Sequence, residues 1–424
     1  MIRYILLFVC SFLPLFLQAQ DKTKDKKPAD EYNRKQLVRS VKEYHKAQNH
    51  AKIEETLNKA FQKYPEARAD GQLMNYQLDA LYGLMKTENT HIFLNNKADT
   101  AKFFSYIYKT YDCALRLDTL DSRPDEKGNV KRRFKENVSS KLSQLRNNLR
   151  SGGKYHYKKR NYAEAYNFFD MYLRTVGSQL TRKNIPAARL GTFDGDSISI
   201  ARLATLSAYA AKQYGKAMTH YTLAARDSTY RLPLLELKAD CYRNLSDTPR
   251  YLQALQDGVS LYPQNESFYS PLITHYDTLG QFSQSMKIVN RLVALDSANA
   301  KYWYLKGKLY QALEQSDSAI WAYKKTIERV DTVAAVYGSL GDMYTLQAHR
   351  FYNQADLHLG TPEYWNNRKQ LNTIYEKACL AYEKARELAP QNNVLWLAGL
   401  REAYFRLNRG KELKALEKLN PQKE

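Results

Sequence analysis

The chain has 424 residues, of which 44% are hydrophobic and 26% are charged, and these proportions exclude a mainly disordered protein. It carries 65 lysines and arginines against 44 acidic residues, a formal net charge of +21, so an anionic partner or surface is a candidate contact. The length allows two or three ordinary domains or one long array of repeats.

Residues 1–19 are predicted to form a secretory signal peptide. Arg3 supplies the positive charge, the apolar core runs from Ile5 to Leu17, and the cleavage site ends at Ala19. A membrane anchor is the alternative, but Pro14 interrupts an apolar stretch that is too short to span a bilayer comfortably. We therefore expect a periplasmic or secreted protein.

A lipid anchor is not favoured, because Cys10 lies inside the apolar core and not directly after it. Residues 20–33 are polar and rich in lysine, and they are predicted to form a flexible leader. No later window has the length and apolar character of a transmembrane segment. We expect no transmembrane segment after cleavage, while peripheral contact with the envelope stays open.

Residues 34–121 are predicted to hold two units, each made of a pair of helices. The first unit has large and small residues at helical spacing and a proline stop: Leu37, Tyr44, Leu57, Ala60 and Pro65. In the second, the first helix covers residues 76–84 and a delayed second helix covers residues 101–117.

Residues 122–197 are predicted to hold a long basic helix, one further second helix and a loop insertion. Residues 122–160 contain 13 lysines and arginines against three acidic residues. We expect the basic helix to run from near Val130 to Tyr157, and the loop to lie between Thr175 and Asp196. Export argues against a nucleic-acid partner, so this charge indicates a solvated helix or, alternatively, an anion- or membrane-surface contact.

Large and small residues recur every 34 residues between Phe268 and Tyr344. Three aromatic residues keep this spacing, and glycines and tyrosines follow at fixed offsets: Tyr269, Trp303 and Tyr337; Gly307 and Gly341; Tyr276, Tyr310 and Tyr344. A period of this length is typical of a helix-turn-helix unit that stacks into a solenoid. Small residues belong where two helices cross closely and aromatic residues fill the gaps, so we expect Tyr269, Trp303 and Tyr337 to be buried.

The unit 300–333 resembles the tetratricopeptide repeat (TPR) family through Trp303, Gly307, Tyr310, Ala319 and Tyr323. The units 198–231, 232–265 and 266–299 follow the same grid. The resemblance implies an all-α fold: an α-solenoid of about nine stacked helix-turn-helix units that forms a right-handed superhelix. It also implies that a peptide docks on the inner surface, which the first helices of the units line.

The regular array is predicted to cover residues 198–392 and to contain one insertion. The unit that starts at residue 334 has its second-helix pattern 25 residues late. We expect the extra residues, about 345–377, to lengthen both helices into a projecting hairpin, with a turn at Gly360 and Thr361 as N-cap. Residues 393–424 are predicted to be a capping unit with one solvated face.

The sequence gives no pattern that predicts catalysis, a cofactor or a metal. The eight histidines include no pair at the i, i+4 spacing of a helical metal site. Cys113, Cys241 and Cys379 are widely separated, which argues against a disulfide framework and favours small buried side chains. We expect the protein not to be an enzyme.

Six residues at inward positions of the first helices are predicted to contact a peptide: Arg202, Tyr209, Arg243, Tyr304, Lys308 and Gln311. An aromatic ring flanked by cations suits an acidic or aromatic peptide. A solvated helix face is the alternative for the same residues. No unit has the lysine and asparagine with which some TPR proteins clamp a terminal carboxylate, which argues against a partner of that kind.

The sequence therefore predicts an exported TPR scaffold that binds a protein or peptide partner in the periplasm or cell envelope. A glycan- or anion-binding envelope protein built on a TPR frame is the alternative. The identity of the partner does not follow from the sequence.

Overall fold

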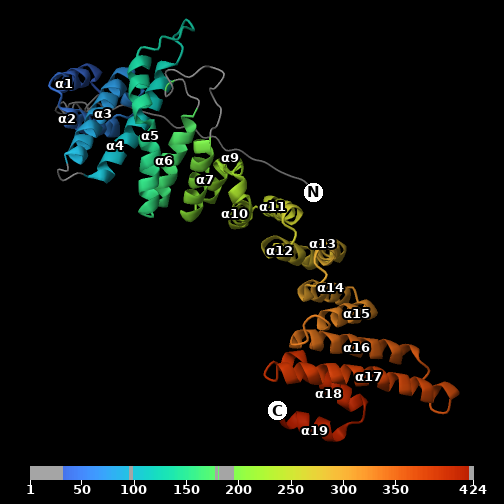
Figure 1. The fold of residues 1–424 in the computed structure, drawn as a ribbon. Helices are drawn as coiled ribbons and strands as arrows, with labels where there is room; N and C mark the ends of the chain where they lie inside the picture. The colour runs from blue at the N-terminus through green and yellow to red at the C-terminus, as the bar shows by residue number, and fades with distance from the viewer. Residues whose placement is uncertain (1–31, 95–98, 177–179, 181–194, 420–424) are drawn as a thin grey trace, which may run out of the picture. The chain divides into compact units, whose positions relative to one another are not determined.

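A computed structural model describes residues 32–94, 99–176, 180 and 195–419 of the chain. Within these residues the fold is all-α, without a strand (Figure 1). The expected signal peptide, residues 1–19, lies outside the described residues. So do nearly all of the expected leader and most of the loop expected between Thr175 and Asp196.

The helices follow one another as pairs joined by short turns. They are α1 (Arg34–Lys46) with α2 (His50–Lys63), α3 (Gly71–Phe93) with α4 (Thr100–Asp121), α5 (Lys135–Lys158) with α6 (Tyr162–Arg174), α7 (Gly195–Ala210) with α8 (Tyr214–Thr219) and α9 (Tyr221–Ala224), α10 (Arg231–Asn244) with α11 (Thr248–Leu261), α12 (Glu266–Thr278) with α13 (Phe282–Leu295), α14 (Ala300–Ala312) with α15 (Ser316–Ile327), α16 (Ala334–Gln354) with α17 (Pro362–Leu388), and α18 (Leu397–Arg406) with α19 (Gly410–Leu419). Short 3-10 turns lie at η1 (Pro65–Ala69), η3 (Ser228–Tyr230) and η4 (Asn393–Leu395). The described part of the chain thus contains nine helix pairs, and the predicted all-α solenoid of stacked pairs is confirmed.

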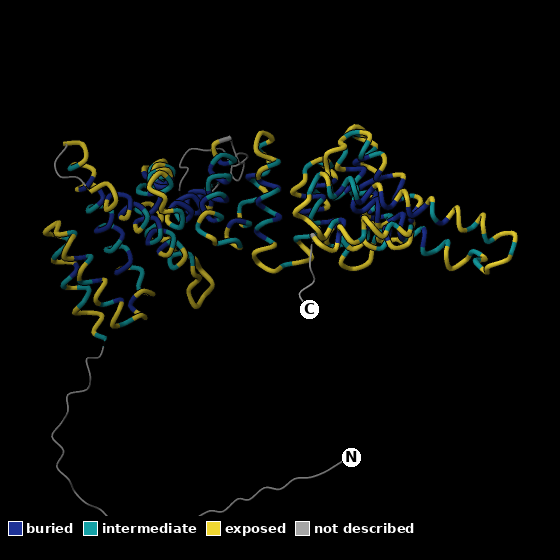
Figure 2. The backbone as a smooth tube through the Cα atoms, turned by 90° about the horizontal axis from the view of Figure 1, so that it is seen from below, coloured by how far each residue is buried: buried dark blue, intermediate teal, exposed yellow. Residues whose placement is uncertain are grey.

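The chain divides into two compact units. Unit 1 comprises residues 1–149 and 178–185, and unit 2 comprises residues 150–177 and 186–424, so the division falls within α5. Each unit has buried apolar residues on its own helices, and the buried stretches are dark blue on the backbone in Figure 2.

Unit 1 is built on the two long helices α3 and α4, which pack against each other. Ile107 and Leu78 are fully buried between them, and the hydroxyl of the buried Tyr111 donates to the carbonyl of Leu142 at 2.6 Å. The expected start of α5 near Val130 is too early, because α5 begins at Lys135. The Asp121 carboxylate accepts the backbone N–H groups of residues 133 and 134, which holds this stretch in a cap outside the helix.

In unit 2, aromatic rings pack directly on helix backbone where a glycine leaves room. A Cβ atom added at Gly307 would lie 2.4 Å from Cε1 of Tyr323. The same arrangement joins Gly258 to Phe268, Gly153 to Phe169, and both Gly341 and Gly399 to Tyr382. The recurring glycines are therefore required by close packing, as their spacing predicts.

Two of the three aromatic residues at the 34-residue spacing are buried. Tyr269 and Trp303 are 3% and 8% exposed. The prediction was wrong for Tyr337, which is only half-buried. The next residue, Gly338, packs against the chain that follows α17. A Cβ atom added at Gly338 would lie 2.5 Å from the carbonyl oxygen of Leu395.

One second helix is broken, which the repeat pattern does not predict. Residues 214–224 form two short helices, α8 and α9, that meet at His220. The Nε2 atom of His220 lies 2.8 Å from Oδ1 of Asp170 on α6, and Arg174 lies 2.8 Å from the other carboxylate oxygen. A polar contact from an earlier helix thus coincides with the break.

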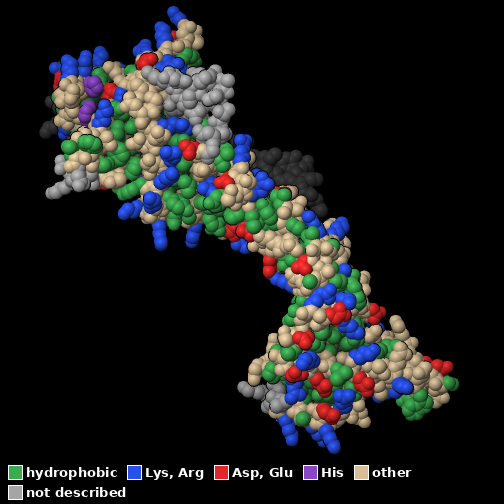
Figure 3. Space-filling model, viewed as in Figure 1, with side chains coloured by type: hydrophobic (Ala, Val, Ile, Leu, Met, Phe, Trp, Pro, Cys, Tyr) green, Lys and Arg blue, Asp and Glu red, His purple; other side chains and the backbone are tan. Residues whose placement is uncertain are grey.

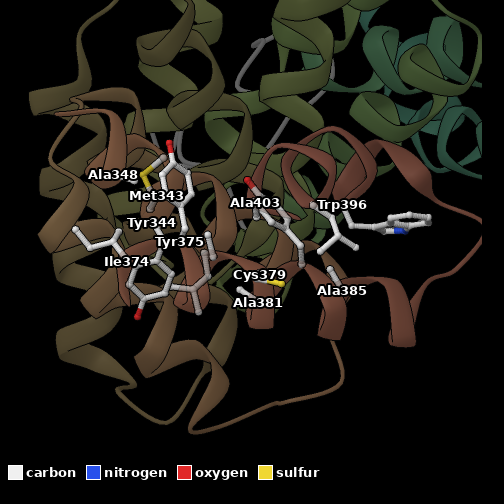
Figure 4. Packing of buried hydrophobic residues seen from close by; sticks show 14 of the residues in the cluster. Met343, Tyr344, Ala348, Ile374, Tyr375, Cys379, Ala381, Ala385, Trp396 and Ala403 are labelled. Carbon is white, nitrogen blue, oxygen red and sulfur yellow. The ribbon is translucent and has the colours of Figure 1, made fainter. Parts of the chain in front are cut away.

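The pair α16 and α17 is longer than the others, with 21 and 27 residues, and forms a hairpin that extends from the rest of unit 2 (Figure 1). Its inner half belongs to a core cluster with α18 that includes Tyr344, Tyr375 and Trp396 (Figure 4). No residue from 349 to 370 is buried.

Candidate functional site

The first helices α7, α10 and α12 of unit 2 border a hollow of about 560 Å³. Its lining mixes aromatic, apolar and charged side chains, among them Tyr209, Glu236, Asp240, Arg243, Phe268 and Pro271. A volume of this size is within the range of small-ligand and peptide-side-chain sites. Two of the six predicted contact residues, Tyr209 and Arg243, lie here.

Asp240 organises the polar side of this hollow. Its carboxylate accepts a hydrogen bond from the Tyr209 hydroxyl at 2.7 Å, one from Asn244 at 3.0 Å, and one from the Arg243 guanidinium. The hydrogen bond to Asp240, followed by burial, raises the pKa of Tyr209 to about 12. Tyr209 is therefore fixed as a neutral donor that joins α7 to α10.

Arg243 keeps most of its hydrogen-bonding capacity for a ligand. Its side chain is 64% exposed although one nitrogen bonds to Asp240. A guanidinium has five N–H donors in a planar fork, so Asp240 orients the group and leaves other donors free. This geometry suits a carboxylate or a peptide carbonyl.

Pro271 interrupts the hydrogen-bond ladder of α12 beside the same hollow. It lies inside α12 and has no N–H, so the helical hydrogen bond to the carbonyl of Ser267 is absent. Ser267 and Pro271 both line the hollow. The proline within a first helix is the sequence signal for this missing bond.

Tyr304, Lys308 and Gln311 form a second group on α14. The hydroxyl of Tyr323 donates to Oε1 of Gln311 at 2.6 Å, and the Tyr304 and Tyr323 ring centroids are 6.0 Å apart. Lys308 is exposed, with its Nζ 3.5 Å from the same Gln311 oxygen. Gln311 and Tyr304 therefore take part in the packing of α14 against α15, whereas the Lys308 side chain is exposed to solvent.

Arg202 is placed differently from the other five. Its guanidinium lies 3.2 Å from Asp227 and 3.6 Å from the Tyr230 ring centroid, and its side chain is 18% exposed. These contacts join α7 to η3. Its charge is neutralised within the unit, so it offers less to a ligand than Arg243 does.

The rest of the chain offers little for other chemistry. The described residues include no group of three or more histidine, cysteine, aspartate or glutamate side chains that could hold a metal ion. None of the described helices is long and apolar enough to cross a membrane. Burial raises the pKa of the Cys241 and Cys379 thiols to about 12, which keeps them protonated.

Comparisons with known proteins bear on the fold alone. No family model matches the sequence, and no curated protein matches it. Among solved structures, the C-terminal part of a TPR repeat-containing protein from Cytophaga hutchinsonii is 16% identical, with 65% of this chain and 96% of that chain covered and a TM-score of 0.41. A TPR repeats protein from Bacteroides fragilis is 17% identical, with 63% and 98% covered and a TM-score of 0.29.

A thermophilic TPR protein from Thermus thermophilus is also 17% identical, with 49% and 99% of the two chains covered and a TM-score of 0.29. The all-α fold that the TPR-like sequence pattern predicts is confirmed by the helix pairs of the described residues. The nine helix pairs described above define that fold, and these scores fix no correspondence between individual repeats.

Proposed function

We propose that this protein is an exported scaffold that binds a protein partner on the inner face of unit 2, at the hollow bordered by α7, α10 and α12. The observation that carries the proposal is the exposed Arg243 guanidinium, held by Asp240 at the edge of a hollow with an apolar floor. A fixed cation beside apolar and aromatic surface is a common arrangement for recognising peptides.

The chemistry of the hollow indicates the kind of segment that would bind. Leu206 and Pro233, which line the hollow and are not buried, offer apolar surface, and Arg243 favours an acidic side chain. Lys308 on α14 adds a second exposed cation. We therefore propose a partner segment that combines acidic and apolar residues.

Site-specific photo-crosslinking in the native envelope tests this proposal. A photoreactive amino acid at position 243 or 308 should capture the same protein, because the proposed partner segment contacts both exposed cations. The matched control is position 287, an exposed lysine on the second helix α13. Capture of identical proteins from positions 243 and 287, or of none from position 243, would contradict the proposal.

Binding should also depend on the cation itself. Arg243→Ala should weaken association with the captured protein about tenfold, since hydrogen bonds to charged groups contribute roughly 1.5–3 kcal/mol. Lys287→Ala should leave it unchanged.

We further propose that the protein acts in the periplasm or outside the cell. The support is the signal-like sequence of residues 1–19, with its charged start, apolar core and small residue at position 19. Deletion of residues 2–19 should retain the protein in the cytoplasm, and an N-terminal sequence of the exported protein should begin at Gln20. Equal export of the deletion variant would exclude this route.

A further inference from the structure

Unit 1 contains a second hollow, of about 590 Å³, that is unrelated to the groove of unit 2. It lies over α3 and is bordered by α2 on one side and α4 on the other, with η1 at one end. Along α4 its lining extends from Lys109 to Thr119 and on to Arg123, just beyond the helix end. At 1.5 Å per residue this is an elongated site of roughly 20 Å.

The floor of this hollow is apolar. Phe61, Met74, Leu81 and Cys113 are each 3–4% exposed as residues, yet all four line the hollow. Burial raises the pKa of the Cys113 thiol to about 12, so the floor carries no charge at neutral pH. Such a surface favours an apolar ligand over water.

The polar groups on the walls are already paired with one another. The Gln77 amide donates to Asn58 at 3.2 Å and its oxygen lies 3.8 Å from the Cys113 sulfur. Lys109 lies 3.4 Å from Glu54, and Arg116 lies 2.9 Å from Asp112. These polar groups bond to one another, so a ligand does not have to supply hydrogen-bond partners for them.

Two cations at the η1 end are the exception. Arg68 on η1 and Arg123 just after α4 line the hollow and are exposed. No ion pair joins either of them to an acidic side chain in the part of the chain that the structure describes. The hollow therefore combines a narrow apolar floor, walls of paired polar groups, and two exposed cations at the η1 end.

We propose that this hollow binds an anionic amphiphile, a single apolar chain that ends in a carboxylate, with the carboxylate between Arg68 and Arg123. Two guanidinium groups suit a carboxylate because each can donate two parallel hydrogen bonds. The apolar chain lies on Phe61, Met74 and Leu81. The site uses no residue of the unit 2 groove, so it does not depend on the function proposed there.

Calorimetric titration of the full chain with octanoate, decanoate and dodecanoate, each below its micelle concentration, tests the proposal. Saturable binding with one ligand per chain is expected, and it should tighten as the chain lengthens because more apolar surface is buried. Decyltrimethylammonium, with a ten-carbon chain and the opposite charge, should bind at least tenfold more weakly than decanoate. Absence of saturable binding for all three carboxylates would overturn the proposal.

The double variant Arg68→Ala, Arg123→Ala should bind dodecanoate at least tenfold more weakly than the unchanged protein. Arg39→Ala is the matched control, since it removes a cation of unit 1 whose side chain is 84% exposed on α1, outside the hollow. Both proteins should give the same circular dichroism spectrum and melting temperature, because the three side chains lie at the surface. Equal loss in the control, or none in the double variant, would contradict carboxylate recognition at this place.

Cys113 provides a readout of position. Because all three thiols are buried, N-ethylmaleimide reacts with them only when the surrounding helices open; dodecanoate should therefore slow alkylation of Cys113 at least threefold, while Cys241 and Cys379 of unit 2 act as internal references within the same digest. Slowing at all three cysteines, or at none, would show that the ligand does not occupy the hollow of unit 1.

Discussion

At the scale of single residues, Trp303 shows how one side chain holds a helix pair together. Its indole N–H donates to the carbonyl of Ser297 at 2.9 Å, before the start of α14. Its ring meets Trp321 of α15 edge to face at 5.1 Å, and the Arg329 guanidinium lies 5.0 Å from its centroid. The side chain thus links the residues before α14, the helix α15 and the residues after α15. Figure 3 shows the charged surface around these helices.

Replacing Trp303 with alanine should lower the free energy of unfolding by about 3–5 kcal/mol, because a large buried side chain and its hydrogen bond are lost. Trp321→Ala is the control, since its side chain is 45% exposed and leaves no enclosed cavity. Its cost should stay below about 1.5 kcal/mol. Urea denaturation monitored by circular dichroism measures both, and equal losses would contradict the structural role of Trp303.

His156 is a second residue whose surroundings have a measurable consequence. Its ring lies on Phe168 at 5.1 Å between centroids, and burial lowers its pKa. Below the ordinary value of about 6.5, the unfolded chain takes up this proton while the folded chain resists it. Stability should therefore fall as the pH decreases below about 6.5.

Melting temperatures at pH 7.5 and pH 5.0 test this. The decrease should be smaller in His156→Phe than in the unchanged protein, because phenylalanine keeps the ring contact and cannot bind a proton. His358→Phe is the control, since the His358 side chain is 91% exposed. An unchanged decrease in His156→Phe would exclude His156 as a source of the pH dependence.

At the scale of elements, the hairpin α16–α17 has two halves with different roles. The inner half contributes Leu371, Ile374 and Tyr375 to the core cluster with α18. The outer half has exposed apolar side chains, with Leu359 80% and Trp365 73% exposed. Stability should therefore depend on the inner half alone.

Replacing residues 352–367 with the turn Gly-Asn-Gly should change the free energy of unfolding by less than about 1 kcal/mol, as expected for surface changes away from a core. Tyr375→Ala, at a residue that is 2% exposed, should cost about 3–5 kcal/mol. Both are measured by urea denaturation. A large loss in the shortened protein would show that the tip packs against something essential.

The helix pairs could be predicted because their pattern is local. Apolar residues at helical spacing, together with a 34-residue period, suffice to place α10 to α15. The break at His220 could not be predicted, since residues 214–224 read as one helix. Its polar contact comes from Asp170, 50 residues earlier in the chain.

The candidate site, like the helix pairs, was predictable only where it depends on a local pattern. Arg243 and Lys308, which the grid assigns to inward positions of first helices, are exposed, and their place on an inner surface stays a prediction. It could not reveal that Asp240 holds Tyr209 and Arg243 together, because that requires two units in contact. The hollow of unit 1 was missed, since it forms where the repeats are weakest and η1 separates α2 from α3. The binding role of the predicted residues stays a prediction.

At the scale of the molecule, stability should be distributed along the array. Among the described residues of unit 2, one cluster of buried side chains lies around α10–α14 and another around α15–α19. In repeat proteins each pair contacts mainly its neighbours, so damage spreads over a limited distance. Parts of unit 2 should therefore open at different denaturant concentrations.

Hydrogen exchange measured by mass spectrometry in low urea should show this. Tyr382→Ala should raise exchange first in α16–α18, and Tyr269→Ala should raise it first in α11–α13, because the two tyrosines belong to different clusters. The two variants serve as controls for each other. A single rate for all protected amides of unit 2 would mean that it unfolds as one cooperative body.

The contact of Tyr323 with Gly307 makes the two positions dependent on each other. Gly307→Ala alone should destabilise by about 1–3 kcal/mol, because the new methyl group meets a ring that has no room to move. The same change at Gly215, where nothing lies within 4 Å, should instead stabilise by about 0.5–1 kcal/mol. Urea denaturation of the two alanine variants distinguishes these signs.

In a Tyr323→Leu background, Gly307→Ala should lose most of its cost, and a double-mutant cycle would measure the coupling. The order in which the two substitutions can occur at such a pair is then constrained. A lineage can first replace the ring by a smaller side chain and then the glycine by alanine. The reverse order passes through a strained intermediate. Each contact of a ring with a glycine therefore restricts the order in which the array can accumulate substitutions.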